Sequence, residues 1–521
     1  MANCGCRTLR EACDHANSSL TSNRFTYYGL VGVLQNYVQY KPDSKIPGGL
    51  GRGQQSATAL GNFFTFWCYV TPIIGAVIAD QYLGKYKTIC LFCAVYFVGE
   101  LILLGTSVPA SIRDGHAFGG YITAIIIIGI GTGGIKSNVS PLVAEQAPSI
   151  ARFVRTEKSG KKVIVDPALT TQRIFMYFYF GINVGSLSAL ATTNLRSRVG
   201  YWAAFILPTC VFTLAIAILL LGRKLYIVRP PEDSVILKAF QALWVAACNG
   251  FNMDAAKPSY LTAKKSYLKV KWNDQFIDEI KRTLVACRIF LFFPIYWICY
   301  SQISNNLISQ AGEMRLGNTP NDLLQNLNPI TLIVFIPLVE RFLYPGLRKI
   351  GIRFLPITRI SWGFFLAAIA MAYAAIVEHR IYNTGPCFSH ITEKCSSNNI
   401  GVWSGAYILI GLSEIFASIS GLEYAFTKAG PSMKSFVMSL FLLTTAGGAI
   451  FSIALSSVAV PPKIMWMYST VSIICFTTGI IFWFTFRHLN DKEDEMNALE
   501  ALGTKPLAIV EKAQNQHENA V

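Results

Sequence analysis

The chain has 521 residues, of which 52% are hydrophobic and only 14% are charged, and its net charge is +16. A soluble chain usually carries about a quarter charged residues, so this composition argues against a soluble enzyme. Apolar runs of roughly 20 residues recur along the chain and indicate a membrane protein with many spans. The positive charge predicts no nucleic-acid partner, because the lysines and arginines gather in alternate loops, where they set membrane orientation.

Twelve membrane-spanning helices are predicted along the chain. We expect them at residues 24–40, 57–79, 88–107, 118–142, 173–193, 201–222, 284–304, 329–346, 358–378, 401–425, 435–457 and 464–486. The polar stretch 223–283 separates an amino-terminal bundle at 24–222 from a carboxy-terminal bundle at 284–486, and a polar tail follows at 487–521. This all-α plan is typical of the major facilitator superfamily, whose two six-helix bundles rock about a central substrate site. A channel or a membrane-embedded enzyme remains open at this stage.

The basic residues predict which loops face the cytoplasm. The central stretch 223–283 is rich in lysine and arginine, so it should be cytoplasmic, and alternation then places both termini on the same side. No short apolar core of the kind found in a cleavable signal peptide lies near the start. Cys387 and Cys395 share one loop on the opposite side and are candidates for a disulfide bond there.

The loop after the second predicted span reads GAVIADQYLGKYKTI, from Gly75 to Ile89. Asp80 ends one helix and Lys85 opens the next, with Gly84 allowing a tight turn between them. We interpret Gly75, Asp80, Gly84 and Lys85 as a cytoplasmic latch, in which the carboxylate faces a partner helix end and the lysine pairs with an acid or a lipid phosphate. A simply solvated loop is the alternative.

The fourth predicted span contains a glycine face and a lysine. Gly129, Gly131, Gly133 and Gly134 leave room for close helix packing. Lys136 follows deep in the apolar run, where a cation costs on the order of 2.5–3.5 kcal/mol on insertion scales. It must therefore face a partner or a water-filled cavity, unless it reaches the membrane interface.

Two further polar side chains fall within predicted spans. Asn183 lies between two glycines and binds either a ligand or a neighbouring helix. Glu414 is flanked by apolar residues in mid-span, which makes it a candidate proton carrier. Glu423 lies nearer the cytoplasmic end and is open to a structural role.

Several motifs together resemble the proton-dependent oligopeptide transporter (POT or PTR) family. They are FTYYG, GTGGIKSNVSP, FYFGINVGS and GLEYAFTKAGPSMKS, and FPIYWICYSQ and NNLISQAG are similar to the fungal branch in particular. The resemblance extends from about Arg24 to the twelfth span. It implies import of di- and tripeptides by proton symport across a fungal plasma membrane, with protons as coupling ion, no other cofactor and no enzymatic activity. We expect the transporter to be a monomer.

The resemblance also implies roles for particular residues. Family positions near the peptide carboxylate are occupied by Arg24, Lys136 and Asn183, and the acid that meets the peptide ammonium group and couples protons matches Glu414. Tyr27 and Tyr28 match hydroxyls lining the cavity, while Trp297 and Asn328 match the seventh and eighth helices more loosely. Without substrate, Lys136 and Glu414 could pair directly, so that a peptide would compete with that pair.

The first helix departs from the family pattern. Relatives read E-x-x-E-R-F before YYG, whereas this chain has Leu20 and Asn23 in place of the glutamates, and residues 1–23 are polar. The remaining apolar stretch of about 16 residues spans only about 24 Å, short of a roughly 30 Å hydrocarbon core. The family's seventh helix also often carries an acid where this chain has Ser301.

Two explanations remain open. In one, residues 1–23 are not the true start of the first helix, through an incorrectly assigned beginning or a truncation, and we favour it because the glutamates and the apolar half-helix are missing together. In the other, the protein is a divergent facilitator or exporter of a peptide-like metabolite, without the usual proton coupling. A peptide receptor without transport and a membrane enzyme are weaker alternatives, the enzyme because no histidine falls within a predicted span.

Overall fold

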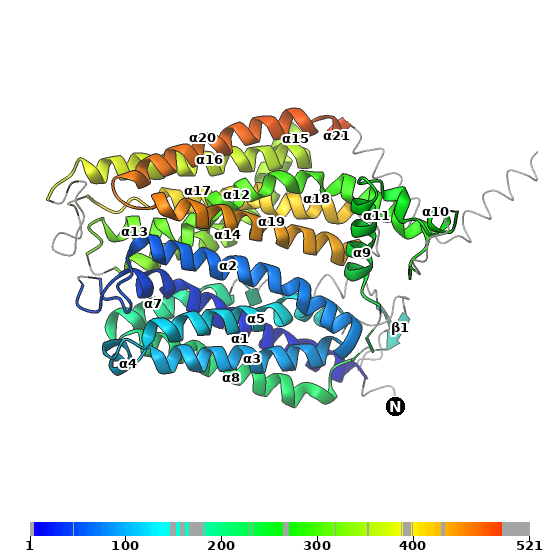
Figure 1. Ribbon diagram of the computed structural model, residues 1–521, viewed down its shortest axis with the longest axis horizontal. Helices are drawn as coiled ribbons and strands as arrows, with labels where there is room; N and C mark the ends of the chain where they lie inside the picture. The colour runs from blue at the N-terminus through cyan, green and yellow to red at the C-terminus, as the bar shows by residue number, and fades with distance from the viewer. Residues whose placement is uncertain are drawn as a thin grey trace, which may run out of the picture.

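The computed structural model describes residues 5–44, 46–145, 153–156, 162–165, 181–182, 184–228, 230–231, 233–263, 270–317, 319–351, 354–386, 388, 398, 400–428 and 433–491. The chain forms two helical bundles that lie side by side, with the amino-terminal half in blue and cyan and the carboxy-terminal half in green to red (Figure 1). Helices α2 and α19 run next to each other where the bundles meet.

The amino-terminal bundle contains seven labelled helices and a small hairpin. The helices are α1 (Gly5–Gln39), α2 (Gly53–Ile78), α3 (Lys85–Thr106), α4 (Pro109–Arg113), α5 (Ala117–Glu145), α7 (Ser188–Arg198) and α8 (Tyr201–Leu221). The hairpin pairs β1 (Phe153–Thr156) with β2 (Lys162–Val165) in antiparallel register, Phe153 opposite Val165.

The central linker is largely helical, and the second bundle follows it. The linker helices are α9 (Val235–Cys248), α10 (Pro258–Ala263) and α11 (Asp274–Cys287), the last of which leads directly into the bundle. The carboxy-terminal helices are α12 (Phe293–Ser301), α13 (Asn306–Gly312), α14 (Leu327–Leu338), α15 (Tyr344–Lys349), α16 (Pro356–Tyr382), α17 (Gly405–Glu414), α18 (Ser420–Lys428), α19 (Lys434–Leu455), α20 (Lys463–Phe486) and α21 (His488–Asp491).

Ten helical segments in the described part of the chain are long and apolar enough to cross a membrane. They correspond to ten of the twelve predicted spans. Residues 173–180 and 183 of the predicted span 173–193 lie outside the described residues, and its end falls on α7. The first span is the other difference, because α1 begins at Gly5 and not at residue 24. Hydropathy marks only the apolar part of a helix, whereas helicity depends on backbone hydrogen bonds that polar residues also support.

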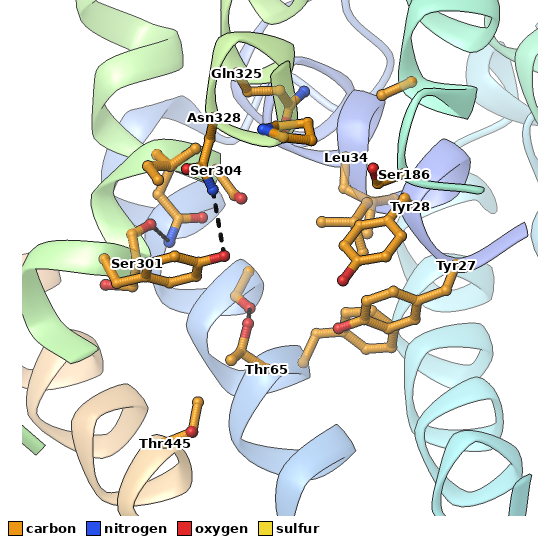
Figure 2. A pocket seen from close by; sticks show the side chains of 18 of the residues that line it. Tyr27, Tyr28, Leu34, Thr65, Ser186, Ser301, Ser304, Gln325, Asn328 and Thr445 are labelled. Carbon is orange, nitrogen blue, oxygen red and sulfur yellow. Dashed lines mark hydrogen bonds between the residues drawn. The ribbon is translucent and has the colours of Figure 1, made fainter. Parts of the chain in front are cut away.

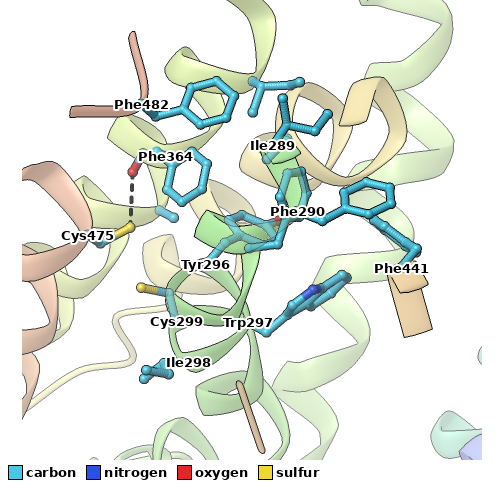
Figure 3. Packing of buried hydrophobic residues seen from close by; sticks show 14 of the residues in the cluster. Ile289, Phe290, Tyr296, Trp297, Ile298, Cys299, Phe364, Phe441, Cys475 and Phe482 are labelled. Carbon is cyan, nitrogen blue, oxygen red and sulfur yellow. Dashed lines mark hydrogen bonds between the residues drawn. The ribbon is translucent and has the colours of Figure 1, made fainter. Parts of the chain in front are cut away.

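Each bundle has a hydrophobic core of its own. In the amino-terminal bundle, buried aromatic rings such as Tyr37 and Phe205 pack edge to face with their centroids 5.4 Å apart. In the carboxy-terminal bundle, Phe364 and Phe482 pack 5.6 Å apart beside Tyr296 (Figure 3). Because the first core draws on residues 30–226 and the second on residues 239–486, the bundles can shift against each other without opening either core.

The glycines of α5 let two neighbouring helices approach closely. A Cβ atom on Gly133 would lie 2.6 Å from the backbone of Thr71 in α2, and one on Gly134 would lie 2.1 Å from the ring of Phe92 in α3. Gly75 of α2 meets the same place, since its Cβ would fall 2.7 Å from the carbonyl oxygen of Gly133. Small residues thus hold α5, which carries Lys136, tightly against α2 and α3.

Hydrogen bonds close the space between the bundles at the end opposite the linker helices, here called the distal end. Asn36 of α1 and Asn321 exchange two amide hydrogen bonds, of 2.8 and 3.0 Å. Thr58 of α2 donates to Asn306 of α13 over 2.9 Å, and Gln325 donates to the carbonyl oxygen of Gly32 over 2.8 Å. Helices α4, α7 and α13 lie at this end, whereas α9, α11 and β1 lie at the other (Figure 1).

Charged side chains hold the linker helices together. Lys257 bridges Asp254 and Asp278 at 3.0 and 2.9 Å, and Lys281 of α11 donates to the same Asp254 carboxylate. Hydrogen bonds from Lys281 and Lys257 hold the pKa of Asp254 below its usual value. The network joins α11, and through it the second bundle, to the preceding linker segment.

The glycine packing of α5 gives a stability prediction. Gly133→Ala should lower the thermal stability of the detergent-solubilised protein, because overpacking against fixed backbone costs about 1–3 kcal/mol. Gly119→Ala on the same helix is the matched control, since its Cβ would meet nothing within 4 Å. Melting temperatures, measured by size-exclusion chromatography after heating, test this. Equal stability of the two variants would contradict the close packing of α5 against α2.

Candidate substrate-binding site

A cavity of about 350 Å³ lies between the two bundles. Side chains from both halves point into it, among them Tyr27 and Tyr28 from α1 and Asn328 and Ser301 from the second bundle (Figure 2). Seven of the eight predicted substrate-binding residues line it: Arg24, Tyr27, Tyr28, Lys136, Trp297, Asn328 and Glu414. The eighth, Asn183, lies outside the described residues and stays a prediction.

The wall formed by the amino-terminal bundle is cationic. Lys136 of α5 places its Nζ 3.3 Å from the ring centre of Tyr69 in α2, a cation–π contact that partly compensates the buried charge. Arg24 of α1 also lines the cavity, and its Nε is buried without a hydrogen-bond acceptor. In the described part of the chain, neither cation pairs with a carboxylate.

The opposite wall carries a carboxyl group. Glu414 is the last residue of α17, where a π-helical turn at Ile415–Ile419 interrupts the helix. Such turns are frequent at functional sites. The Nδ2 of Asn328 donates to Glu414 over 3.3 Å and to the hydroxyl of Tyr300 over 3.4 Å. Two of the predicted residues are thus in direct contact on this wall.

The direct pairing of Lys136 with Glu414 does not occur. No ion pair joins these two described residues. Lys136 instead contacts the ring of Tyr69, and Glu414 accepts a hydrogen bond from Asn328. Tyr28 also lines the cavity and interacts electrostatically with both Arg24 and Glu414. The cavity therefore has cations on one side and a carboxyl group on the other, with their charges not neutralised by each other.

Trp297 and Ser301 connect α12 to α19 along the cavity. The Nε1 of Trp297 donates to Thr444 over 2.9 Å, and the ring is only 7% exposed, so it forms part of a firm wall. The hydroxyls of Ser301 and Ser452 lie 3.1 Å apart. The position where relatives often carry an acid is therefore filled here by a neutral hydroxyl pair.

Sequence reasoning missed several lining residues. They are Tyr69, Tyr300, Asn305, Gln325 and Thr445. Tyr300 lies one position before Ser301, so its place beside the cavity could have been inferred from that motif. The others carry no separate signal, because a lone hydroxyl or amide in a span serves helix packing as readily as a ligand.

The predicted latch has the expected turn. Asp80 lies in a π-helical turn at Ala79–Leu83, and Gly84 ends it with φ of +75°, which favours glycine, before Lys85 opens α3. Gly75 instead contacts α5, as described above. The latch function itself stays a prediction.

A buried ion pair joins the bundles at the distal end. Arg196 of α7 and Asp322 meet at 2.5 Å, and their side chains are 3% and 1% exposed. Asp322 precedes α14 and so belongs to the other bundle. A lone charge left at such a depth is costly, so this pair favours the arrangement in which the distal end is closed.

The chain is similar to proteins of one known family. A model of the POT family matches residues 86–474, more than half of the chain. The chain is 53% identical over 480 residues to the "Probable peptide transporter ptr2" of Schizosaccharomyces pombe, covering 92% of this chain and 78% of that protein. It is 48% identical over 481 residues to the "Peptide transporter PTR2" of Saccharomyces cerevisiae, covering 92% and 79%.

A solved structure shares the fold. The crystal structure of the POT family transporter PepTSo superposes with a TM-score of 0.72 over 92% of this chain and 98% of that one, at 22% sequence identity. The fold is that of a multi-pass membrane protein of the major facilitator type. The chain belongs to the POT family.

The buried ion pair gives a conformational prediction. Arg196→Gln should open the distal end, because it leaves Asp322 alone at a cost on the order of 3–5 kcal/mol. The double variant R196Q/D322N leaves no lone charge and should close more fully than the single variant. Spin labels at the exposed positions Asp114 and Lys463, each changed to Cys, report the distance across this end by electron resonance. Unchanged distances in Arg196→Gln would contradict a role for the pair in closure.

Proposed function

We propose that the protein imports di- and tripeptides together with protons by alternating access. The observation that carries this proposal is the charge arrangement of the cavity, with Arg24 and Lys136 on one bundle and Glu414 on the other, not paired with each other. A short peptide is a zwitterion, so its two ends complement these two walls. Binding would then draw the bundles together about the substrate.

The rest of the cavity suits a substrate with variable side chains. Between the charged walls the lining is aromatic, aliphatic and hydroxylic, as with Tyr27, Phe64, Leu332 and Thr445. A cavity of about 350 Å³ lies within the usual range for small-molecule sites, about 300–1,000 Å³. Fixing only the peptide termini and leaving this space between them would accept many sequences.

Glu414 is the residue that we propose as proton carrier. Its partner Asn328 and the nearby Tyr300 are neutral, and amide and hydroxyl groups form hydrogen bonds to both the ionised and the protonated carboxyl group. The same carboxyl group can then hold either a proton or the peptide ammonium group. Proton coupling at this site needs neither the missing first-helix glutamates nor an acid at Ser301.

The names of two relatives and the position of the basic loops support our assignments of substrate and membrane orientation. The two fungal relatives are named as peptide transporters. The basic linker and the other basic loops lie at one end of the molecule, which we assign to the cytoplasm together with both termini. We further propose a plasma-membrane location and a monomer, since one chain builds the whole cavity.

A facilitator or exporter of a peptide-like metabolite is the second candidate. The neutral pair Ser301–Ser452 favours it, because this position carries no titratable group. This candidate predicts saturable transport that does not respond to collapse of the proton gradient.

The two candidates differ in one uptake experiment. A yeast strain deficient in peptide transport and expressing this chain should take up a labelled dipeptide, and a protonophore should abolish that uptake. Glu414→Gln should reduce uptake by more than tenfold and remove its pH dependence, because the amide cannot carry the proton. Glu340→Gln, at an exposed acid in the π-helical turn that follows α14, is the matched control and should behave as the unchanged protein.

Each outcome has a distinct meaning. Uptake that persists with the protonophore would favour the facilitator. Full pH dependence in Glu414→Gln would remove the proposed role of this residue. Absence of uptake, from protein confirmed at the cell surface, would contradict peptide import.

A further inference from the structure

Two buried carboxyl groups lie at the distal end, outside the substrate cavity. Glu313 directly follows α13 and is 6% exposed, and Glu378 lies in the last turns of α16 and is fully buried. Neither lines the cavity. Transport through the central site therefore does not account for two acids at this depth.

The two carboxyl groups contact each other. A hydrogen bond joins Glu313 to Glu378, and the Nε2 of Gln310 in α13 donates to Oε2 of Glu378 over 2.7 Å. The hydroxyl of Tyr382 in α16 also forms a hydrogen bond with Glu378. Ionised carboxylates only accept hydrogen bonds, so two carboxyl groups can bond to each other only when at least one is protonated.

No cation in the described part of the chain neutralises the pair. The titratable groups that face it are tyrosines, namely Tyr40 after α1, Tyr382 of α16 and Tyr468 of α20. The nearest charges beyond Tyr40 are Arg196 and Asp322, which pair with each other.

The cations close to the pair in sequence point elsewhere. Arg315, His379 and Arg380 are exposed, and the Arg380 guanidinium lies 4.8 Å from the ring centre of Trp403. Two like charges in such surroundings repel strongly, so a proton shared between them is the low-energy state.

The pair is attached to the contacts that close the distal end. Gln310 belongs to α13, and its neighbour Ser309 bonds to Gln35 and Gln39 of α1 over 3.2 and 2.6 Å. Asn321, which bonds to Asn36 of α1, also donates to the backbone of α13 at Ile308 over 2.9 Å. When the bundles separate here, α13 loses its contacts with α1, and water gains access to the carboxyl groups beside it.

We propose that Glu313 and Glu378 form a second proton-binding site, which holds a shared proton while the distal end is closed and exchanges it with the outside medium when that end opens. This proposal rests on the proposed function only in assigning the distal end to the outside. Its proton is not the transported one, because it returns to the side from which it came. External acid should thus favour closure, and the site would set the external pH at which the transporter cycles.

The test measures closure directly and does not need transport. With spin labels at Asp114→Cys and Lys463→Cys in lipid nanodiscs, the closed population of the unchanged protein should fall as the pH rises from 5 to 8. One linked proton changes the ratio of closed to open by at most tenfold per pH unit. In the double variant E313Q/E378Q the amides bond without a shared proton, so the ratio should depend less steeply on pH than in the unchanged protein, and only the dependence due to Glu414 should remain.

A second measurement covers the case in which the double variant does not fold. The single variant E313Q keeps the bond from Gln310 to Glu378. Infrared difference spectra of the unchanged protein at neutral pH should contain a protonated-carboxyl C=O band that is lost in E313Q and kept in the exposed control E340Q. Persistence of that band in E313Q would overturn the proposal, as would equal pH dependence of closure in the unchanged protein and the double variant.

Peptide counterflow, run on the same preparations, tests the proposed function separately. Counterflow driven by peptide alone should survive in E313Q/E378Q, because the substrate cavity is unaltered. Loss of counterflow in the unchanged protein would refute peptide transport, and it would leave the carboxyl pair to be judged by the closure and infrared data.

Discussion

The structure depends on opposite charges that are buried in a membrane protein and are held apart. Lys136 is stabilised by the ring of Tyr69, and Glu414 by the amide of Asn328. Each charged group has enough local stabilisation to remain in the cavity, yet neither is neutralised by the other. The two walls therefore remain unpaired, and a zwitterionic substrate placed between them would bind to both, one end to each.

The two bundles can move toward a bound substrate because each has a firm core of its own, while the contacts between them are weak. Each bundle has its own aromatic core, whereas the distal end is held mainly by amide and hydroxyl hydrogen bonds such as Asn36–Asn321 and Thr58–Asn306. Neutral hydrogen bonds contribute only about 0.5–1.5 kcal/mol each and are readily replaced by water. The buried ion pair Arg196–Asp322 also joins the bundles here, and removing only one of its partners would leave an uncompensated buried charge.

Much of this architecture could be predicted from the sequence, because hydropathy and basic loops report directly on the membrane. The motifs around Arg24, Lys136 and Glu414 also pointed to residues that line the cavity from both bundles. The start of α1 at Gly5 could not be obtained in this way, because helicity does not require apolar side chains. The contact of Lys136 with Tyr69 was also missed, since it depends on the packing of α5 against α2 and not on any local pattern.

Contacts between segments that are distant in the sequence could not be predicted either, because they too depend on packing and not on a local pattern. Nothing near Glu313 in the sequence indicates Glu378, which lies on another helix, and the two become a pair only through the fold of the carboxy-terminal bundle. Likewise, Ser301 could be recognised as the loss of an acid, but its bond to Ser452 requires the placement of α12 against α19. Pairing of polar groups is set by tertiary structure, whereas their presence is set by sequence.

The most direct test of the central claim compares binding of blocked dipeptides to the purified protein. A free dipeptide should bind at least tenfold more tightly than its N-acetylated form and than its C-amidated form, because each block removes one of the two charges. In Glu414→Gln the penalty for N-acetylation should disappear while the penalty for C-amidation remains, and in Lys136→Gln the C-amidation penalty should shrink while the N-acetylation penalty remains. If the losses of affinity on N-acetylation and on C-amidation were the same in both variants as in the unchanged protein, opposite walls would not bind the two peptide ends.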